Sequence, residues 1–332
     1  MFLRSLLSVL LLPLLASAAT PAKEVTVYSV YDGERLAPIF KPFTDRTGIK
    51  VTVINDSSEK LIQRLQEEGA ATQADLHLDK DLVYLGKAQQ LGLYRPFNSQ
   101  VVEANIPGTL IESQKNWFLL FYRARIIMYN RHKVNPSELS TYEALGDSKW
   151  QGRLCVRTSK DSYNQALGAF FVYHYGEKRT AELLSSWVKN FATAPLKNDR
   201  EVIRAIAEGK CDVGIANSYY LAPFVKADPD FAVRPFFPNQ NTTGTHINGV
   251  GIGIVKHAKN VAEATLLLEY LTSKEVQAPV ASAFSQYPAN PAAPLNEILV
   301  QFGAFKADLT NIGNFSPFVD LANSITINAG YR

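Results

Sequence analysis

Residues 25–54 read VTVYSVYDGERLAPIFKPFTDRTGIKVTVI, and this stretch decides the fold class. It begins with an apolar run, residues 25–30, that is typical of a buried strand. Residues 33–47 have the spacing of an amphipathic helix, which Gly48 ends before a second apolar run at 50–54. The apolar residues at helical spacing are Leu36, Phe40 and Phe43. This order predicts a βαβ unit, the building block of a parallel sheet covered by helices.

The same alternation continues along the chain and predicts an α/β fold. Two apolar stretches, 117–122 and 125–129, follow each other without a long helix between them, and 247–255 forms a third. We expect these to be strands that cross between two lobes and form a hinge beside a ligand cleft. The other predicted elements are helices 58–68, 82–90, 163–175, 179–190 and 199–208, and strands 74–78, 153–157 and 211–216.

The first 18 residues have the pattern of a secretory signal peptide. Arg4 precedes an apolar stretch at 6–15, and Ala16-Ser17-Ala18 supplies a small-residue cleavage site. We therefore predict export and cleavage after Ala18. The roughly 314 residues that remain exceed one comfortable core and imply two lobes. The predicted first lobe covers 19–120 plus about 248–295, the second about 131–243 plus about 296–332, with crossing strands near 117–130 and 244–250.

The charge balance excludes several kinds of partner. The whole chain has 34 basic and 31 acidic residues, and cleavage removes only Arg4 from this count. A mature net charge of about +2 without a basic tract argues against nucleic acid or an anionic membrane as the main partner.

Two cysteines, Cys155 and Cys211, each lie on a predicted strand. An even number of cysteines in an exported protein permits a disulfide. If the two strands are neighbours, the bridge ties them beneath the cleft. If they are not, the thiols are small buried residues.

Common enzyme signatures are missing from the sequence. It contains no H-E-x-x-H, P-loop, G-x-S-x-G or C-x-x-C motif. The five histidines are scattered without metal-ligand spacing, so a zinc site is not expected. Gly249, Gly251 and Gly253 lie inside a predicted strand, where they favour close backbone packing over phosphate binding. We predict a binding protein that is not an enzyme.

Three tyrosines are the candidate ligand residues. Tyr219 and Tyr220 follow the predicted strand 211–216, and Tyr163 follows strand 153–157 where a helix begins. Side chains at the carboxyl ends of strands in an open α/β sheet face the crevice that binds ligands. Phenolate oxygen suits a hard, highly charged ion such as Fe(III). For the Tyr219–Tyr220 pair alone, the simpler interpretation is that one tyrosine belongs to the core and its neighbour caps the edge of the sheet.

Eight segments carry a resemblance to a known family, and together they extend over nearly all of the mature chain. They are 122–130 (YRARIIMYN), 138–143 (ELSTYE), 150–153 (WQGR), 162–165 (SYNQ), 217–220 (NSYY), 237–240 (FPNQ), 244–248 (GTHIN) and 303–306 (GAFK). In these segments the sequence resembles the periplasmic ferric-ion-binding proteins, the iron-binding components of ABC importers.

The resemblance implies a two-lobed periplasmic binding protein fold of type II, like a transferrin lobe, with the ligand site in the interlobe cleft. Tyr163, Tyr219 and Tyr220 match the tyrosine ligands of the branch that uses three phenolates from one lobe. Arg123 matches an arginine that binds a synergistic carbonate or bicarbonate. Asn198 and Asn217 match polar residues of the same pocket.

The first lobe departs from the family pattern. Asp32 falls where the family often has a histidine, and Gly33 where a tyrosine sometimes follows. Some members of the family have a glutamate in the first lobe, which is replaced here in the run Leu78-Asp79-Lys80-Asp81. Lys80 in this run would repel a cation. Either Asp32 binds iron directly, or the first lobe gives no ligand and water or carbonate completes the coordination shell of the iron. We favour the second alternative, in which Tyr31 or Asp32 forms a hydrogen bond with the bound anion.

The predicted function is capture of ferric iron in the periplasm by a monomer and its delivery to an inner-membrane ABC permease. The lobes would close about the crossing strands as iron binds. The alternative is a binding protein for an oxyanion or organic anion on the same fold, using Arg123 and the helix start at Tyr163 without metal. Three phenols favour the metal, because an oxyanion pocket has little use for them.

Overall fold

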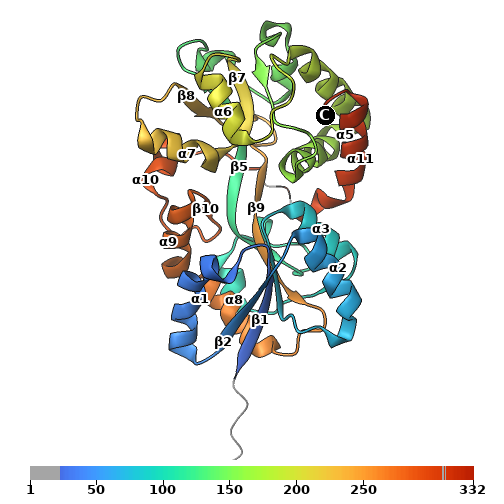
Figure 1. The fold of residues 1–332 in the computed structure, drawn as a ribbon, viewed down its shortest axis with the longest axis vertical. Helices are drawn as coiled ribbons and strands as arrows, with labels where there is room; N and C mark the ends of the chain where they lie inside the picture. The colour runs from blue at the N-terminus through green and yellow to red at the C-terminus, as the bar shows by residue number, and fades with distance from the viewer. Residues whose placement is uncertain (1–22, 309, 311) are drawn as a thin grey trace, which may run out of the picture.

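The computed structural model describes residues 23–332 except 309 and 311, so the predicted signal peptide lies outside the described residues. The chain forms two lobes stacked along the long axis and joined by two long strands (Figure 1). These are β5 (Phe118–Asn130) and β9 (Ile247–Val255). Within the described part of the chain, no helix has the length and apolar character needed to cross a membrane.

One lobe holds the elements before β5 and those directly after β9. Its elements are β1 (Glu24–Ser29), α1 (Gly33–Thr47), β2 (Lys50–Asn55), α2 (Ser58–Glu68), β3 (Leu76–Asp79), α3 (Leu82–Gln90), β4 (Tyr94–Arg95), α4 (Gln100–Asn105), α8 (Val261–Thr272), α9 (Lys274–Phe284) and β10 (Tyr287–Pro288). The other lobe contains β6 (Leu154–Cys155), α5 (Ser162–Asn190), α6 (Asp199–Ala207), β7 (Val213–Asn217), α7 (Ser218–Ala227), β8 (Val233–Phe236), α10 (Glu297–Phe302) and α11 (Val319–Asn328). Short 3-10 turns connect them, among them η2 (Gly108–Leu110), η6 (Ile312–Asn314) and η7 (Ser316–Phe318).

The predicted βαβ unit is confirmed. Strands β1 and β2 pair in parallel, and α1 runs between them. Asp32 starts the helix by accepting a hydrogen bond from the backbone of Arg35, and Gly48 ends it in the left-handed conformation with φ 71°. The sheet continues in the order β2-β1-β3-β9-β5-β7-β6.

The two crossing stretches near 117–130 form one strand instead of two. The first half of β5 pairs with β9, and from Arg125 onward it pairs with β7 and β8. The backbone thus stays extended while its partner changes from one lobe to the other. The glycines of β9 allow close packing, as predicted: a Cβ on Gly249 would lie 2.3 Å from the carbonyl oxygen of Phe121.

The predicted helices 163–175 and 179–190 are confirmed as the two parts of α5, which are separated at Gly176, where the backbone is not helical and φ is 76°. Two other sequence predictions need correction. The predicted strand 153–157 shortens to the two residues of β6, because only Leu154 and Cys155 pair with β7. Tyr219 and Tyr220 belong to the first turn of α7 and not to the end of a strand.

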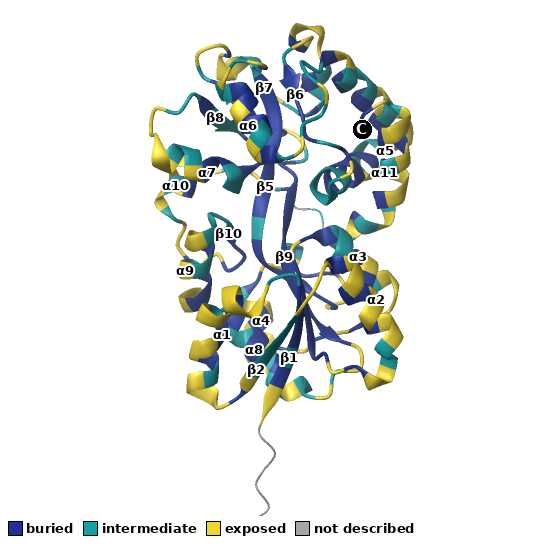
Figure 2. Cartoon of the chain, in the orientation of Figure 1, coloured by how far each residue is buried: buried dark blue, intermediate teal, exposed yellow. Residues whose placement is uncertain are grey.

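Each lobe has its own hydrophobic core, and the crossing strand β5 contributes to both. Figure 2 shows β9 buried along its length while the outer faces of the helices are exposed. The first core gathers residues between Val25 and Phe121 and again between Ile247 and Ala289. The second lobe is built on two clusters that begin at Ala124 and Ile127 of β5. The residue limits that we predicted for the lobes remain predictions.

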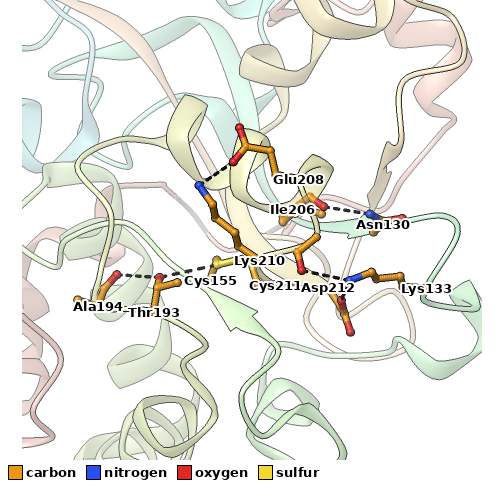
Figure 3. The surroundings of a disulfide bond; sticks show 11 residues. Asn130, Lys133, Cys155, Thr193, Ala194, Ile206, Glu208, Lys210, Cys211 and Asp212 are labelled. Atoms are coloured by element: carbon orange, nitrogen blue, oxygen red, sulfur yellow. Dashed lines mark hydrogen bonds and ion pairs between the residues drawn. A yellow bond between two sulfur atoms is a disulfide. The ribbon is translucent and has the colours of Figure 1, made fainter.

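Cys155 and Cys211 form a disulfide, so the first of the two alternatives for these residues is correct (Figure 3). Cys155 ends β6, and Cys211 stands two residues before β7, the strand that pairs with β6. The bridge therefore ties together the two strands that lead to α5 and α7. Both cysteines are buried.

Candidate metal centre

The three candidate tyrosines lie at the beginnings of two helices of the second lobe. Tyr163 is in the first turn of α5, whose cap, Asp161, accepts a hydrogen bond from the Tyr163 backbone at 3.0 Å. Tyr219 and Tyr220 are in the first turn of α7. The hydroxyl of Ser218 accepts a hydrogen bond from the backbone of Ala124, which fixes the start of α7 to the crossing strand β5. A local cap therefore positions Tyr163, whereas a contact with the distant strand β5 positions Tyr219 and Tyr220.

The structure brings the phenols together from positions 56 residues apart in the chain. The Tyr219 hydroxyl donates a hydrogen bond to the Tyr163 hydroxyl, with 3.3 Å between the oxygens. The rings of Tyr219 and Tyr220 are packed with their centres 4.2 Å apart. Arg200 lies over the outer face of the set, 4.9 Å from the ring centre of Tyr220.

Two guanidinium groups lie against Tyr163. The central carbon of Arg123 is 4.8 Å from the ring centre, and that of Arg157 is 5.4 Å away. Arg123 is 2% exposed and donates to the backbone carbonyl of Lys80 at 2.6 Å. Among the described residues its Nε has no hydrogen-bond partner. A buried N–H group without an acceptor is costly, so this donor has capacity for a ligand.

Burial makes the phenols hold their protons tightly. It raises the pKa of Tyr163 to about 12, although the positive charge of Arg123 acts in the opposite direction. Burial also raises the pKa of Tyr219 well above that of a free phenol. Both groups are therefore neutral at pH 7, and only a strongly charged ion could displace their protons.

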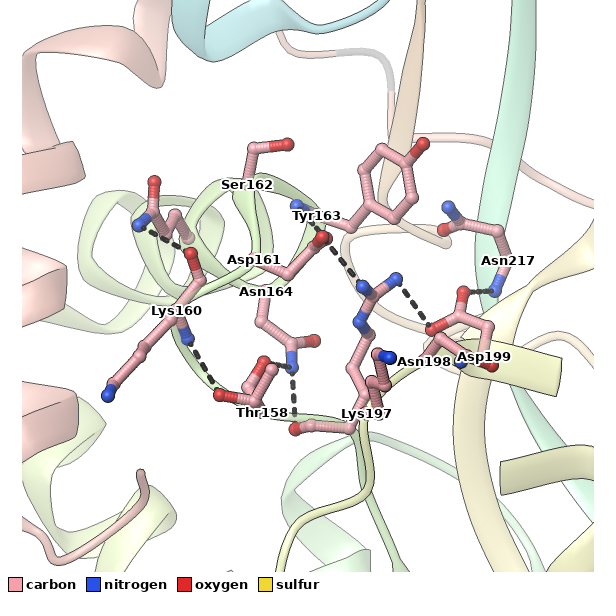
Figure 4. A network of polar contacts seen from close by, with 12 residues as sticks. Thr158, Lys160, Asp161, Ser162, Tyr163, Asn164, Lys197, Asn198, Asp199 and Asn217 are labelled. Carbon is pink, nitrogen blue, oxygen red and sulfur yellow. Dashed lines mark hydrogen bonds and ion pairs between the residues drawn. The ribbon is translucent and has the colours of Figure 1, made fainter. Parts of the chain in front are cut away.

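A network of charged and amide groups supports the site (Figure 4). Arg125 donates to Asp199 at 2.9 Å and to Asn217 at 3.0 Å, and Asp199 also accepts from the backbone of Asn217 at 2.8 Å. Arg157 bridges Asp161 and Asp199. Since Asn217 precedes α7 and Asp161 caps α5, the network fixes both helix starts relative to each other.

Sequence reasoning missed the residues at the centre of this network, Arg125, Arg157 and Asp199. The signal was present for Arg125, because a charged residue inside an apolar crossing strand needs a buried partner. Its partner could not be found from the sequence, since Asp199 is 74 residues away. The Nδ2 of Asn217 and the Nε of Arg157 also have no hydrogen-bond partner in the part of the chain described here, so they are further donors with free capacity.

The remaining predicted site residues have structural contacts of their own. Asn198 caps α6: its amide accepts from the backbone of Glu201 and donates to the Glu201 carboxylate. Asp32 caps α1 and is exposed. Tyr31 lies under the guanidinium of Arg35, with 4.6 Å from its central carbon to the ring centre. Binding roles for these three residues remain predictions.

A metal site of the usual kind is not found elsewhere. Among residues 23–308, 310 and 312–332, no group of three or more His, Cys, Asp or Glu side chains is placed to hold a metal ion. The tyrosine cluster is thus the candidate metal centre.

Two lobes joined by crossing strands, with ligand-type side chains at helix starts beside the junction, define a solute-binding protein of the type II fold. Residues 39–307 match the family model described as bacterial extracellular solute-binding protein. The chain belongs to this family.

Its relatives include proteins named for iron. Iron uptake protein A1 of Synechocystis sp. is 38% identical over 323 residues, which is 95% of this chain and 90% of the relative. The major ferric iron-binding protein of Neisseria meningitidis is 26% identical and covers 83% of this chain and 84% of its own. The Trichodesmium protein IdiA (FutA), solved in complex with iron and citrate ligands, superimposes with a TM-score of 0.88 at 38% identity, covering 93% of this chain and all of the other.

Proposed function

We propose that this protein binds ferric iron through the phenolate oxygens of Tyr163, Tyr219 and Tyr220. The observation that carries the proposal is the direct hydrogen bond between the hydroxyls of Tyr219 and Tyr163, with the Tyr220 ring packed beside them. Two oxygens 3.3 Å apart are close enough to bind one ion. Three phenolates would neutralise the charge of Fe(III) and favour it over Fe(II). The names of the Synechocystis and Neisseria relatives support iron as the ligand.

We further propose that a small oxyanion, carbonate or bicarbonate, binds beside the metal. Arg123 and Asn217 supply its donors, because the Arg123 Nε and the Asn217 Nδ2 are buried and lack hydrogen-bond partners among the described residues. The N-terminus of α5 adds a favourable dipole for an anion. Asn198 is a further candidate donor. In the first lobe, Tyr31 or Asp32 would bond to the same anion, and Asp32 is a candidate metal ligand.

The role that follows is transport. As an exported member of an ABC importer, the protein would carry iron through the periplasm to an inner-membrane permease, without chemical change to a substrate. Since all three phenols come from the second lobe, iron would bind there first. The first lobe would then close over it about β5 and β9 and shift the population towards the closed form.

The test is a titration of the iron-free protein with Fe(III) presented as a weak chelate, followed by visible absorption. We expect a phenolate-to-iron charge-transfer band that reaches its maximum at one iron per protein. Tyr219→Phe, Tyr220→Phe and Tyr163→Phe should each weaken affinity by at least about tenfold, which corresponds to about 1.4 kcal/mol. Tyr173→Phe, on the exposed side of α5, is the matched control and should behave like the wild type.

A calorimetric titration with anions, beside the iron titration, separates the alternative function. A protein that binds an oxyanion without metal would give heat in a calorimetric titration with carbonate, phosphate or citrate alone and no visible band with iron. The Tyr→Phe variants would then bind the anion as well as the wild type does.

A further inference from the structure

Helix α3 of the first lobe touches the second lobe at two separate points. Its cap, Asp81, accepts a hydrogen bond from the hydroxyl of Ser162 at the start of α5, at 2.9 Å. One turn into the helix, Gly86 packs against Ser316 of η7. Figure 1 places α3 at the boundary between the lobes.

Asp81 connects three elements at once. It is fully buried, and besides Ser162 it accepts from the side-chain amide of Asn248 on β9 at 3.0 Å. The oxygen that accepts from Ser162, Oδ2, also lies 3.5 Å from a guanidinium nitrogen of Arg123 on β5, whereas Asn248 donates to Oδ1. Arg123 and Asn248 stand opposite each other in the pairing of β5 with β9. One carboxylate therefore holds both crossing strands and the second lobe.

The second contact depends on the absence of a side chain. A Cβ built on Gly86 would lie 2.1 Å from the Cβ of Ser316, a distance that real atoms do not reach. Leu82 and Val83, on the same helix, line a small cavity together with Ala166 and Ala169 of α5. Helix α3 thus contacts the second lobe through a packed surface in addition to the hydrogen bond of Asp81.

We propose that α3 is the closure surface of the cleft and that Asp81 is the positioning residue that couples closure to Arg123. When the lobes meet as they do in this structure, Asp81 accepts a hydrogen bond from Ser162 and pairs with the guanidinium of Arg123, which also lies over the ring of Tyr163. Opening of the lobes breaks the Asp81–Ser162 bond and separates Gly86 from Ser316. This inference rests on the proposed function, because it gives Arg123 its role beside the phenols.

Two variants test the closure surface, each at one of its two separate contacts with the second lobe. Ser162→Ala removes the interlobe hydrogen bond, and Gly86→Ala adds a methyl group that keeps the lobes apart. Both should release iron to excess citrate faster than the wild type in a stopped-flow assay, Ser162→Ala by about 2- to 13-fold, the rate equivalent of one hydrogen bond. Small-angle X-ray scattering should give Gly86→Ala with iron a larger radius of gyration than the wild type with iron.

Ser324→Ala on α11 and Gly108→Ala in η2 are the matched controls, because Ser324 is exposed and a Cβ on Gly108 meets nothing within 4 Å. Both should match the wild type in rate and in shape. The inference is overturned if Ser162→Ala and Gly86→Ala keep the wild-type release rate and radius of gyration while the charge-transfer band forms normally. A wild-type protein that forms no band would instead overturn the proposed function, and the radius of gyration of iron-free Gly86→Ala would still test the closure surface.

Discussion

At the scale of single residues, the candidate site contains two phenols, Tyr163 and Tyr219, that hold their protons. Burial raises the pKa of Tyr163 to about 12 and raises the pKa of Tyr219 well above its ordinary value. The guanidinium of Arg123 opposes this effect at both residues. Under the proposed function, only an ion charged strongly enough to compete with protons could bind the oxygens of Tyr163 and Tyr219.

Iron binding should release protons. Each phenol that becomes a ligand loses one, so we expect about three protons per ferric ion at pH 7, after correction for those taken up by the chelator that delivers the iron. Because the pKa of Tyr163 is about 12, affinity should rise with pH throughout the range below that value and fall on acidification. Calorimetry in two buffers of different ionisation enthalpy measures the count. Tyr220→Phe should release one proton fewer, and an unchanged count would remove Tyr220 from the metal shell.

A second residue-scale prediction concerns Asp79, which is fully buried at the end of β3. Burial raises its pKa to about 7. A carboxyl group whose pKa is higher in the folded state than in the unfolded state costs stability as pH rises from about 4 through 7. Asp79→Asn should therefore increase the free energy of unfolding at pH 8 by more than about 1 kcal/mol, and the gain should be smaller at pH 5. Urea unfolding at the two pH values measures this.

The exposed Glu67→Gln serves as the control for charge removal and should change stability little at either pH. An equal gain for Asp79→Asn at pH 5 and pH 8 would contradict the assignment of a protonation effect.

At the scale of elements, the junction between strand and helix places the ligands. β6 leads through a short turn to α5 and Tyr163, and β7 leads directly to α7 with Tyr219 and Tyr220. The two strands are parallel neighbours, so both helix starts lie at the same edge of the sheet. The Arg125–Asp199 network fixes this edge, and the disulfide ties β6 to the segment that precedes β7.

Loss of the disulfide should weaken the packing of β6 against β7. Cys155 and Cys211 are 56 residues apart, and a bridge across a loop of that length stabilises a fold by about 2–5 kcal/mol. The double variant Cys155→Ser/Cys211→Ser should unfold at lower denaturant concentration and bind iron more weakly. Wild-type protein treated with reductant provides the comparison. If the double variant and the oxidised wild type share one unfolding midpoint, the bridge contributes nothing to stability.

At the scale of the whole molecule, two lobes share two continuous strands. β5 pairs with β9 in its first half and with β7 in its second, so neither lobe can move without bending these strands. The phenols belong to the second lobe, while Asp81 and Lys80 of the first lobe contact Arg123 from the other side. Arg123 therefore contacts both the candidate site and the first lobe.

Iron should stabilise the whole chain. A ligand that binds only the folded state adds about 2.7 kcal/mol at a free concentration one hundred times its dissociation constant. The melting temperature should rise with iron, and differential scanning calorimetry follows it. Tyr219→Phe/Tyr220→Phe should lose most of the shift. A full shift in that double variant would show that the iron binds elsewhere.

Much of the fold could be predicted from local pattern. The βαβ unit, β9 and α6 depend on apolar spacing and on caps within a few residues, such as Asp32 and Gly48. Predictions were wrong where the outcome depends on partners distant in sequence. β5 is a single strand because it pairs with β9 along its first half and with β7 along its second half. β6 is short because only two of its residues pair with β7.

The sequence by itself determined the type of the elements and the residues able to bind a hard ion, because hydrophobic spacing and side-chain chemistry are properties of neighbours in the chain. Only the tertiary structure decided that the Tyr163 and Tyr219 hydroxyls meet, that Arg125 pairs with Asp199, and that Asp81 reaches Ser162. Those contacts join residues 56, 74 and 81 positions apart. Their geometry comes from strand order and helix packing, which no local stretch of sequence contains.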